Sequence, residues 1–444
     1  MEDTNIFESD NIPRSYITLA MPVVLSMVVT LVYNLADTFF VAQTGNTALV
    51  AGVSLGAPLF TALMAIGNIF GQGGSSLISR LMGQKDLDAA HRASSFCFYI
   101  TLFIGIVIAF LMFVFRKPLL MVPGADPETM EYASAYFVPL ALGAPFVMLS
   151  FIHSNLLRSE GLSKESMVGT VTGAIVNIVL DPIMISSFGW GAAGAAIATV
   201  IGYIVSDMIF LSMVKRKSTV LSVSPSCINA PKIHIIQIIG IGVPAAISNL
   251  MQSFMAVMTN QYLLVYGNDK IAAMGIVLKV SMIALLILTG LAFGGQPLFG
   301  YYYGLGDKER LSKLFRFTLL FILAAALVLT VFILISSPLL MRIFMDNPSI
   351  VKDGTLMLRL QVVTMPLVGI ILLLTVMFQS AGKIASSFIL SISRQGVIFF
   401  AVLAVMNITL GYIGIVAAQA VSDIITAIIA LLLFRIGMRD SIKT

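Results

Sequence analysis

Residues 16–41 read YITLAMPVVLSMVVTLVYNLADTFFV, a long apolar run in which only Asp37 carries a charge. An α-helix rises about 1.5 Å per residue, so a run of this length crosses the ~30 Å hydrocarbon core of a bilayer. The stretch therefore predicts a transmembrane helix that contains a carboxyl group. Because a charge inside a membrane is costly, such a group usually faces a cavity and binds or relays an ion.

The rest of the chain has the same apolar character. Hydrophobic residues make up 58% of the 444 and charged residues 11%, too few charges to cover a soluble protein of this size. Strand-like alternation is absent, which argues against a β-barrel. We predict an all-α integral membrane protein with twelve spans. They are expected near residues 16–41, 50–79, 94–115, 132–157, 165–186, 191–213, 234–265, 271–302, 314–336, 354–380, 386–408 and 411–434.

Charge placement predicts the orientation of these spans. Most of the 26 Lys and Arg residues fall in the loops on the side of the two termini, so the positive-inside rule places both termini in the cytosol. The net charge of +5 reflects this bias and does not indicate a nucleic-acid partner. Two cysteines and three scattered histidines predict neither a structural disulfide nor a metal centre.

The chain divides into two similar halves. A polar segment at 215–232 lacks a span and reads as a linker, which gives an N-lobe at 1–214 and a C-lobe at 233–444. The sequence GNIFG at 67–71 returns as GLAFG at 290–294, and other matched glycines and prolines keep an offset of 220 to 223. Six spans are an even number, so we expect parallel repeats related by a pseudo-two-fold axis near the membrane normal.

Two intramembrane carboxyl groups are the main candidates for function. Asn34 precedes Asp37 by three residues, and Asn177 precedes Asp181 by four, so each pair shares one face of a helix. The rise per residue places both carboxyl groups in the outer half of the membrane, where they can share a cavity. Two desolvated neighbouring acids suit proton exchange, and the added asparagine oxygens also suit Na⁺ at Asp37, Asn177 and Asp181. The alternative is that each carboxyl stays neutral and only bonds a neighbouring helix.

Other polar residues inside spans have weaker assignments. Lys279 and Arg394 either line a cavity in the C-lobe or form structural pairs, with Asp423 as the expected partner of Arg394. Asp207, near the inner end of its span, is expected to be solvated at the interface. Pro22 should bend the first helix, because proline removes a backbone hydrogen bond. The other expected lining residues are Asn68, Asn155, Asn249 and Gln252.

Four stretches resemble one transporter family. They are NLADTFFV at 34–41, GNIFGQGGSSLISRLMGQK at 67–85, APFVMLSFIHSNLLRSEG at 144–161 and NIVLDPIMISSFGWGAAGAAIATV at 177–200. They are similar to the multidrug and toxic compound extrusion (MATE) transporters, over nearly the whole chain. The resemblance implies twelve helices in two six-helix lobes and cation-coupled export of organic, often cationic, compounds.

Within that family the chain resembles the bacterial DinF-like and MepA-like branch. The resemblance implies that Asp37 and Asp181 are the two coupling carboxylates, with Asn177 beside them and Tyr136 lining the same site. Another branch uses acids on the seventh and tenth helices for sodium. The corresponding spans here contain no Asp or Glu, which argues against a C-lobe carboxylate site.

These observations favour a secondary antiporter that exchanges organic cations for H⁺ or Na⁺. The chain has no Walker A pattern and no nucleophile–base set within its spans, so neither direct ATP use nor enzymatic catalysis is expected. We expect no cofactor, a lipid bilayer and small organic cations as partners, a functional monomer, and the bacterial inner membrane as its location. One alternative is a lipid-linked oligosaccharide flippase, which would need a cationic groove. Another is a channel or a structural membrane protein.

Overall fold

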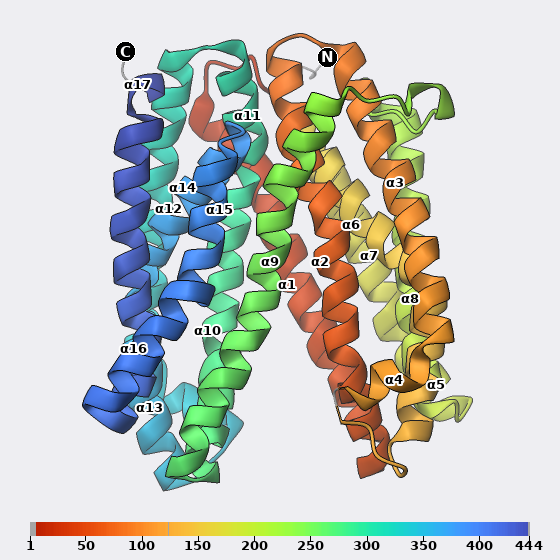
Figure 1. Ribbon diagram of the computed structural model, residues 1–444, viewed down its shortest axis with the longest axis vertical. Helices are drawn as coiled ribbons and strands as arrows, with labels where there is room; N and C mark the ends of the chain where they lie inside the picture. The colour runs from red at the N-terminus through yellow and green to blue at the C-terminus, as the bar shows by residue number, and fades with distance from the viewer. Residues whose placement is uncertain (1–5, 123, 443–444) are drawn as a thin grey trace. The chain divides into compact units, whose positions relative to one another are not determined.

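The computed structural model describes residues 6–122 and 124–442, and every regular element in this part of the chain is a helix (Figure 1). The all-α prediction is confirmed. The chain forms two compact units. The first unit runs from Leu25 to Ala246, and the second consists of the residues up to Val24 together with those from Ile247 onward. Each unit is described by itself below.

The first unit is built on long helices connected by short turns. Its elements are the part of α1 (Ile12–Ala42) from Leu25 on, α2 (Thr47–Gly83), α3 (Leu87–Val114), α4 (Arg116–Met121), α5 (Met130–Leu142), α6 (Ala144–Ser159), α7 (Ser163–Pro182), η1 (Ile183–Ser187), α8 (Gly191–Lys217), η2 (Pro225–Cys227) and the part of α9 (Lys232–Leu263) up to Ala246.

The second unit contains the start of α1, the remainder of α9 and the elements that follow. These are η3 (Leu264–Tyr266), α10 (Asn268–Gly294), α11 (Gln296–Leu305), α12 (Lys308–Phe344), α13 (Pro348–Val362), α14 (Met365–Ser380), α15 (Ile384–Ile392), η4 (Ser393–Val397), α16 (Ile398–Gly437) and α17 (Arg439–Ile442).

The apolar helices account for the predicted spans. Within the described residues, nine helices are long and apolar enough to cross a membrane, and two bent helix pairs raise the number to eleven. The longest apolar segment, Ile384–Gly437, covers the predicted spans 386–408 and 411–434. The backbone of Gly411 leaves the helical region there with φ 55°, and the chain reverses its direction within α16 (Figure 1). This segment therefore contains two of the twelve predicted spans.

Two spans that the sequence predicts as single helices are broken. The bend is 54° between α5 and α6 and 42° between α13 and α14. Pro145 follows the first residue of α6, and Pro366 follows the first residue of α14. Proline has no N–H and its ring clashes with the carbonyl four residues earlier, so it favours a kink or a break, and here the helix breaks. The two prolines match each other in the sequence repeat, and both units carry the break at the same place.

α1 and α9 each contribute to both units. α1 passes from the second unit to the first after Val24, and α9 passes from the first to the second after Ala246. Each passage lies two residues beyond a proline inside the helix, Pro22 or Pro244. The compact units therefore differ from the predicted lobes at 6–24 and 233–246, and the predicted linker at 215–232 belongs to the first unit. The pseudo-two-fold axis and the lobe boundaries stay predictions.

Close helix contacts hold these exchanged segments. A Cβ added to Gly242 of α9 would lie 1.9 Å from the Ile69 carbonyl oxygen of α2. In the second unit, a Cβ on Gly294 of α10 would lie 2.3 Å from the Cα of Ala20 in α1. Only glycine permits backbones to approach this closely, and small residues at helix contacts are the usual means of tight packing in membranes.

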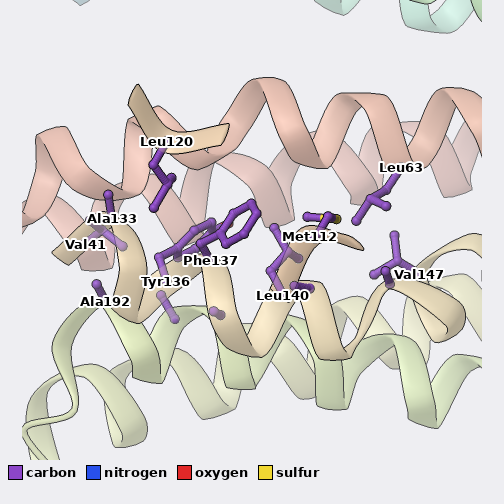
Figure 2. Close-up of a cluster of buried hydrophobic side chains, with 14 of the residues drawn as sticks. Val41, Leu63, Met112, Leu120, Ala133, Tyr136, Phe137, Leu140, Val147 and Ala192 are labelled. Carbon is purple, nitrogen blue, oxygen red and sulfur yellow. The ribbon is translucent and has the colours of Figure 1, made fainter. Parts of the chain in front are cut away.

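A buried apolar cluster fixes the broken helix of the first unit. Phe137 and Leu140 of α5 point between neighbouring helices and are fully buried, together with Leu120 of α4 and Val147 of α6 (Figure 2). Close packing of buried side chains resists the movement of any one of them. The cluster also includes Tyr136, and it therefore positions one side of the site described below.

The predicted linker at 215–232 is docked on the first unit. The Glu160 carboxylate, just beyond α6, accepts the backbone N–H groups of Thr219 at 2.7 Å and Val220 at 3.0 Å, and it also accepts the Ser218 hydroxyl. Ser95 donates to the carbonyl of Ser222 at 2.9 Å. The segment is thus held by specific hydrogen bonds and is not a free tether.

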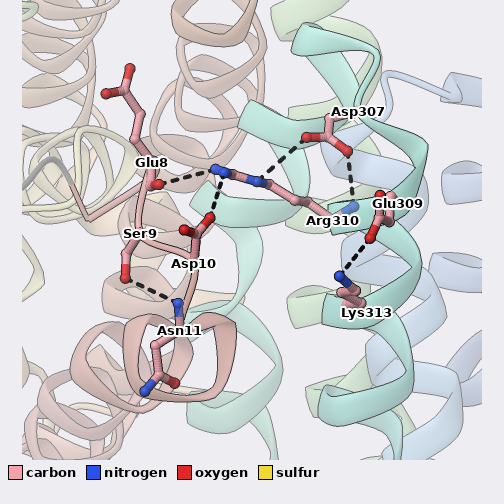
Figure 3. A network of polar contacts seen from close by, with 8 residues as sticks. All are labelled: Glu8, Ser9, Asp10, Asn11, Asp307, Glu309, Arg310 and Lys313. Atoms are coloured by element: carbon pink, nitrogen blue, oxygen red, sulfur yellow. Dashed lines mark hydrogen bonds and ion pairs between the residues drawn. The ribbon is translucent and has the colours of Figure 1, made fainter.

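The N-terminal segment is fastened to the second unit. The Arg310 guanidinium of α12 donates to the Glu8 carbonyl at 3.1 Å and to the Asp10 carboxylate at 2.8 Å (Figure 3). Asp307, which directly precedes α12, contacts the same guanidinium. Phe7 stacks on Tyr301 with ring centroids 4.8 Å apart. These contacts extend the second unit to the residues that precede α1.

Candidate functional site

Asp181 lies at the end of α7 and is fully buried. In the amide orientation that satisfies both of its partners, Asn177 donates to Asp181 Oδ2 at 3.1 Å and accepts the backbone N–H of Thr199 at 3.0 Å. Pro182 and the π-helical turn η1 follow directly, and such turns are frequent at functional sites. The predicted contact between Asn177 and Asp181 is present. The backbone N–H of Thr199 in α8 holds the Asn177 amide in the orientation that this contact needs.

Asp37 of α1 belongs to the same cluster. It is close enough to Asp181 for their charges to interact, and Tyr136 of α5 interacts with both carboxyl groups. Asp37 Oδ1 is buried without a hydrogen-bond partner. A buried acceptor without a partner is unusual and needs an explanation such as an ion, a water or a proton that comes and goes.

The sequence predicts that Asn34 belongs to this cluster, but the structure places it outside. Its side chain is exposed, and its backbone carbonyl accepts the Thr38 hydroxyl at 2.9 Å. The residue that enters instead is Tyr33, which interacts with Asp37 and is hydrogen-bonded to Thr199. Tyr33 precedes Asp37 by four residues, so it occupies the same helix face, and this spacing is the signal that could have identified it.

A small cavity with several hydroxyl groups in its lining adjoins the cluster. It has a volume of about 50 Å³, and its lining includes Tyr33, Asn177, Thr199, Tyr203 and Ser206. This is room for a few water molecules and is far below the ~300 Å³ of a drug-sized pocket. The cavity therefore suits a proton, a small cation or water, and organic cargo does not fit in it.

Other predicted residues of the first unit lie in networks of their own. The Asn155 amide donates to the Phe151 carbonyl at 2.7 Å and to Asn68 Oδ1 at 3.4 Å, and Arg158 donates to Asn155 Oδ1 at 2.7 Å. The expectation of interfacial solvation for Asp207 is wrong. Asp207 is 4% exposed and faces His153 of α6, because α6 covers this part of α8.

In the second unit, Arg394 forms the predicted ion pair with Asp423. Arg394 Nε donates to Asp423 Oδ1 at 3.0 Å, and Asp423 also accepts hydrogen bonds from Gln419 and Thr364 at 2.9 Å each. Asn249 is half-buried, and Gln252 and Lys279 are exposed. These residues are not gathered into a cluster like that around Asp181.

The two units differ at matching positions of the repeat. In the register that aligns Gly191 with Gly411, Thr199 and Tyr203 correspond to Gln419 and Asp423, and the region of Ala174 corresponds to Arg394. Ala174, Thr199 and Tyr203 line the cavity of the first unit. In the second unit, an ion pair and its hydrogen bonds stand at those positions.

Comparison with known proteins identifies the chain's relatives. The MatE family model matches residues 22–183 and again 244–413. The multidrug export protein MepA of Staphylococcus saprophyticus is 31% identical over 97% of this chain and 95% of its own length. Two solved structures are similar over 100% of this chain at 26% identity and a TM-score of 0.92. One is a MATE protein in complex with MaL6, matched over 100% of its length, and the other is an outward-facing multidrug resistance MATE transporter of the MOP superfamily, matched over 99%. A family match over both halves of the chain and full-length relatives lead to one conclusion: this protein is a multi-pass membrane transporter that belongs to the MatE family.

Proposed function

We propose that this multidrug efflux transporter exports organic cations in exchange for protons that bind at Asp37 and Asp181. The observation that carries the proposal is the burial of Asp181 beside Asp37, where its other partners among the described residues are the neutral side chains of Asn177 and Tyr136. A carboxylate without a cationic partner in a membrane is stabilised by taking up a proton or a cation. A proton and a cationic substrate would therefore compete for the same negative charge.

The neighbouring side chains support both states of the acid pair. The Asn177 amide stabilises an ionised Asp181, and hydroxyl groups line the cavity that Asn177 shares, where they can accept or donate a proton. The same oxygens would also suit Na⁺ at Asp37, Asn177 and Asp181, and this remains the alternative coupling ion. Exchange of one ligand for the other needs alternating access, and the prolines at which α1 and α9 change units are the candidate bending points.

The wider setting follows from this function. We place the protein in the bacterial inner membrane, with both termini in the cytosol, and we expect it to work as a monomer without a cofactor. Transport involves no covalent step. The positive charge bias of the loops supports the orientation.

The first prediction tests the acid pair. We expect Asp181→Asn to abolish drug efflux because the variant cannot exchange a proton or attract a cation, and Asp37→Asn to lower efflux at least tenfold. Glu131→Gln is the control, since Glu131 is an exposed carboxyl on the helix that carries Tyr136. Efflux of a fluorescent cation is measured in cells with matched membrane expression. Wild-type efflux by Asp181→Asn would refute the assignment.

The coupling ion is tested separately. Purified protein in liposomes is given either a pH gradient or a sodium gradient, and uptake of the fluorescent cation is followed. We expect the pH gradient alone to drive transport in the wild type and not in Asp181→Asn. Transport driven only by sodium would transfer the role of these carboxylates to Na⁺ binding.

A further inference from the structure

A second pair of ionisable side chains is buried in the first unit. His153 of α6 is 2% exposed and Asp207 of α8 is 4% exposed, and His153 Nδ1 lies 3.4 Å from Asp207 Oδ1. His153 Nε2 and Asp207 Oδ2 have no hydrogen-bond partner. The imidazole is flanked by the rings of Phe98 and Phe210, with centroids 5.5 and 6.3 Å away. Two unsatisfied polar atoms in such a pair are costly and call for a functional explanation.

Tyr203 lies one helical turn before Asp207 and lines the cavity beside the acid pair. It precedes Asp207 by four residues on α8 and interacts electrostatically with it. Tyr203 also interacts with Tyr33, which interacts with Asp37. Both tyrosines line the cavity that Asn177 shares, and Ser206 extends its lining along α8. The cavity lining thus includes Asn177, the partner of Asp181, and two hydroxyl groups that lie four residues and one residue before Asp207 on α8.

The pair lies between the acid pair and one end of the first unit. Lys217 at the end of α8 bonds Glu165 at the start of α7, so these two helix ends lie together. Asp207 is ten residues from the end of α8, or about 15 Å, and Asp181 is eighteen residues from the start of α7, or about 27 Å. This end is the one that the charge bias assigns to the cytosol.

Charged and titratable side chains lie on the helices that pack around the pair. The titratable groups that interact with Asp207 are the His153 imidazole and the Tyr203 hydroxyl. The other charged groups on the packed helices lie towards the helix ends. They are Arg80 of α2, Asp88, His91 and Arg92 of α3, Glu131 of α5, Arg158 of α6, Lys164, Glu165 and Asp181 of α7, and Lys215, Arg216 and Lys217 of α8; the neutral titratable groups are Cys97, Tyr99, Tyr132 and Tyr136.

We propose that His153 and Asp207 form a second proton-binding site, through which the Asp37–Asp181 pair exchanges its coupling proton with the cytosol. This inference rests on the proposed proton coupling. A proton leaves the Asp181 carboxyl, passes along the hydroxyl groups and water of the cavity, and binds His153. The resulting imidazolium pairs with the Asp207 carboxylate until the proton is released. Histidine suits this step because one ring nitrogen can accept a proton while the other donates one.

Two transport modes separate this role from a structural one. Net export driven by a pH gradient requires proton binding and release, whereas exchange of labelled for unlabelled substrate across the same liposomes requires neither. We expect His153→Gln and Asp207→Asn to slow pH-driven transport at least tenfold and to keep substrate exchange within twofold of the wild type. Ser166→Ala is the control, because it removes a partly buried hydrogen bond of 3.0 Å between α6 and α7, and neither serine lines the cavity.

Each result decides the question. An equal loss of both transport modes would show a structural role and overturn the proposal, as would wild-type pH-driven transport in both variants. In the second case an inactive Asp181→Asn would leave the acid pair and proton coupling intact. A wild-type protein that does not respond to a pH gradient would instead refute proton coupling, and the second proton site with it.

Discussion

Two buried aspartates of this protein have opposite electrostatic surroundings. Asp423 has a guanidinium and two further hydrogen-bond donors within 3.0 Å, so its charge is fully compensated. Asp181 has an amide partner and a second acid nearby. The first arrangement holds a permanent charge, and the second favours a ligand that arrives and leaves. This difference explains why the first unit, and not the second, is the candidate for ion coupling.

The ion pair gives a prediction on stability. Arg394→Met should lower the free energy of unfolding by about 3–5 kcal/mol, because it leaves the Asp423 carboxylate buried without a counter-charge. The double variant Arg394→Met with Asp423→Leu should lose clearly less, since neither charge is left buried. Denaturant titration in detergent measures both. A single variant as stable as the wild type would show that Asp423 is not charged in the folded protein.

Much of the site could be predicted at the level of residues, and its limits are physical. Asn177 and Asp181 are neighbours because four residues make about one helical turn, so their contact follows from sequence alone. Asn34 and Tyr33 both lie about one turn before Asp37, and only the packing of neighbouring helices decides which one faces inward. Thr199 and Asp207 come from α8, whose rotation relative to α6 and α7 is a property of tertiary packing.

At the level of elements, breaks in the helices repeat between the units. Apolar length predicts where the long helices lie: each predicted span coincides with an apolar helix, a bent helix pair or one part of Ile384–Gly437. It does not predict that Pro145 and Pro366 break their spans while Pro22 and Pro244 lie inside continuous helices. Proline permits either outcome in a membrane, because neighbouring helices can satisfy the freed backbone groups.

Helix contacts through glycine give a prediction within one helix. Gly294→Ala in α10 should destabilise the protein by about 1–3 kcal/mol, because its Cβ would lie 2.3 Å from the Cα of Ala20 and backbone must move. Gly275→Ala in the same helix meets no atom within 4 Å and should stabilise by about 0.5–1 kcal/mol. Thermal unfolding in one detergent compares them. Equal effects of the two substitutions would contradict the close α1–α10 contact.

At the level of the whole molecule, the polypeptide between the two sequence halves is part of the first unit's structure. Glu160 accepts four hydrogen bonds from residues 218–220, and Ser94, Ser95 and Tyr99 of α3 donate to the carbonyls of Ser222 and Val223. Composition identifies this segment correctly as lacking a span. Its docking depends on the Glu160 carboxylate and on three hydroxyl groups of α3, whose roles are not visible in the sequence.

The docked segment gives a prediction on proteolysis. Glu160→Gln should raise the rate of trypsin cleavage within 215–232 about tenfold, because loss of charge-assisted hydrogen bonds worth about 1.5–3 kcal/mol increases the opened population. Glu165→Gln is the control, since its partner Lys217 is 52% exposed and such surface pairs contribute little. Cleavage is followed by gel electrophoresis of the purified protein. Equal rates in the two variants would show that Glu160 does not hold the segment.

The passage of α1 and α9 between units has a consequence for the ancestry of the chain. The first helical segment of each half, up to Val24 in one and up to Ala246 in the other, belongs to the compact unit that the other half forms. A half-length ancestor with this arrangement would form each compact unit by exchanging its first helical segment with a second copy, as in a domain-swapped dimer. Gene fusion of two such copies would make that exchange permanent. It would also free the two halves to diverge, one towards exchangeable acids and the other towards a fixed ion pair.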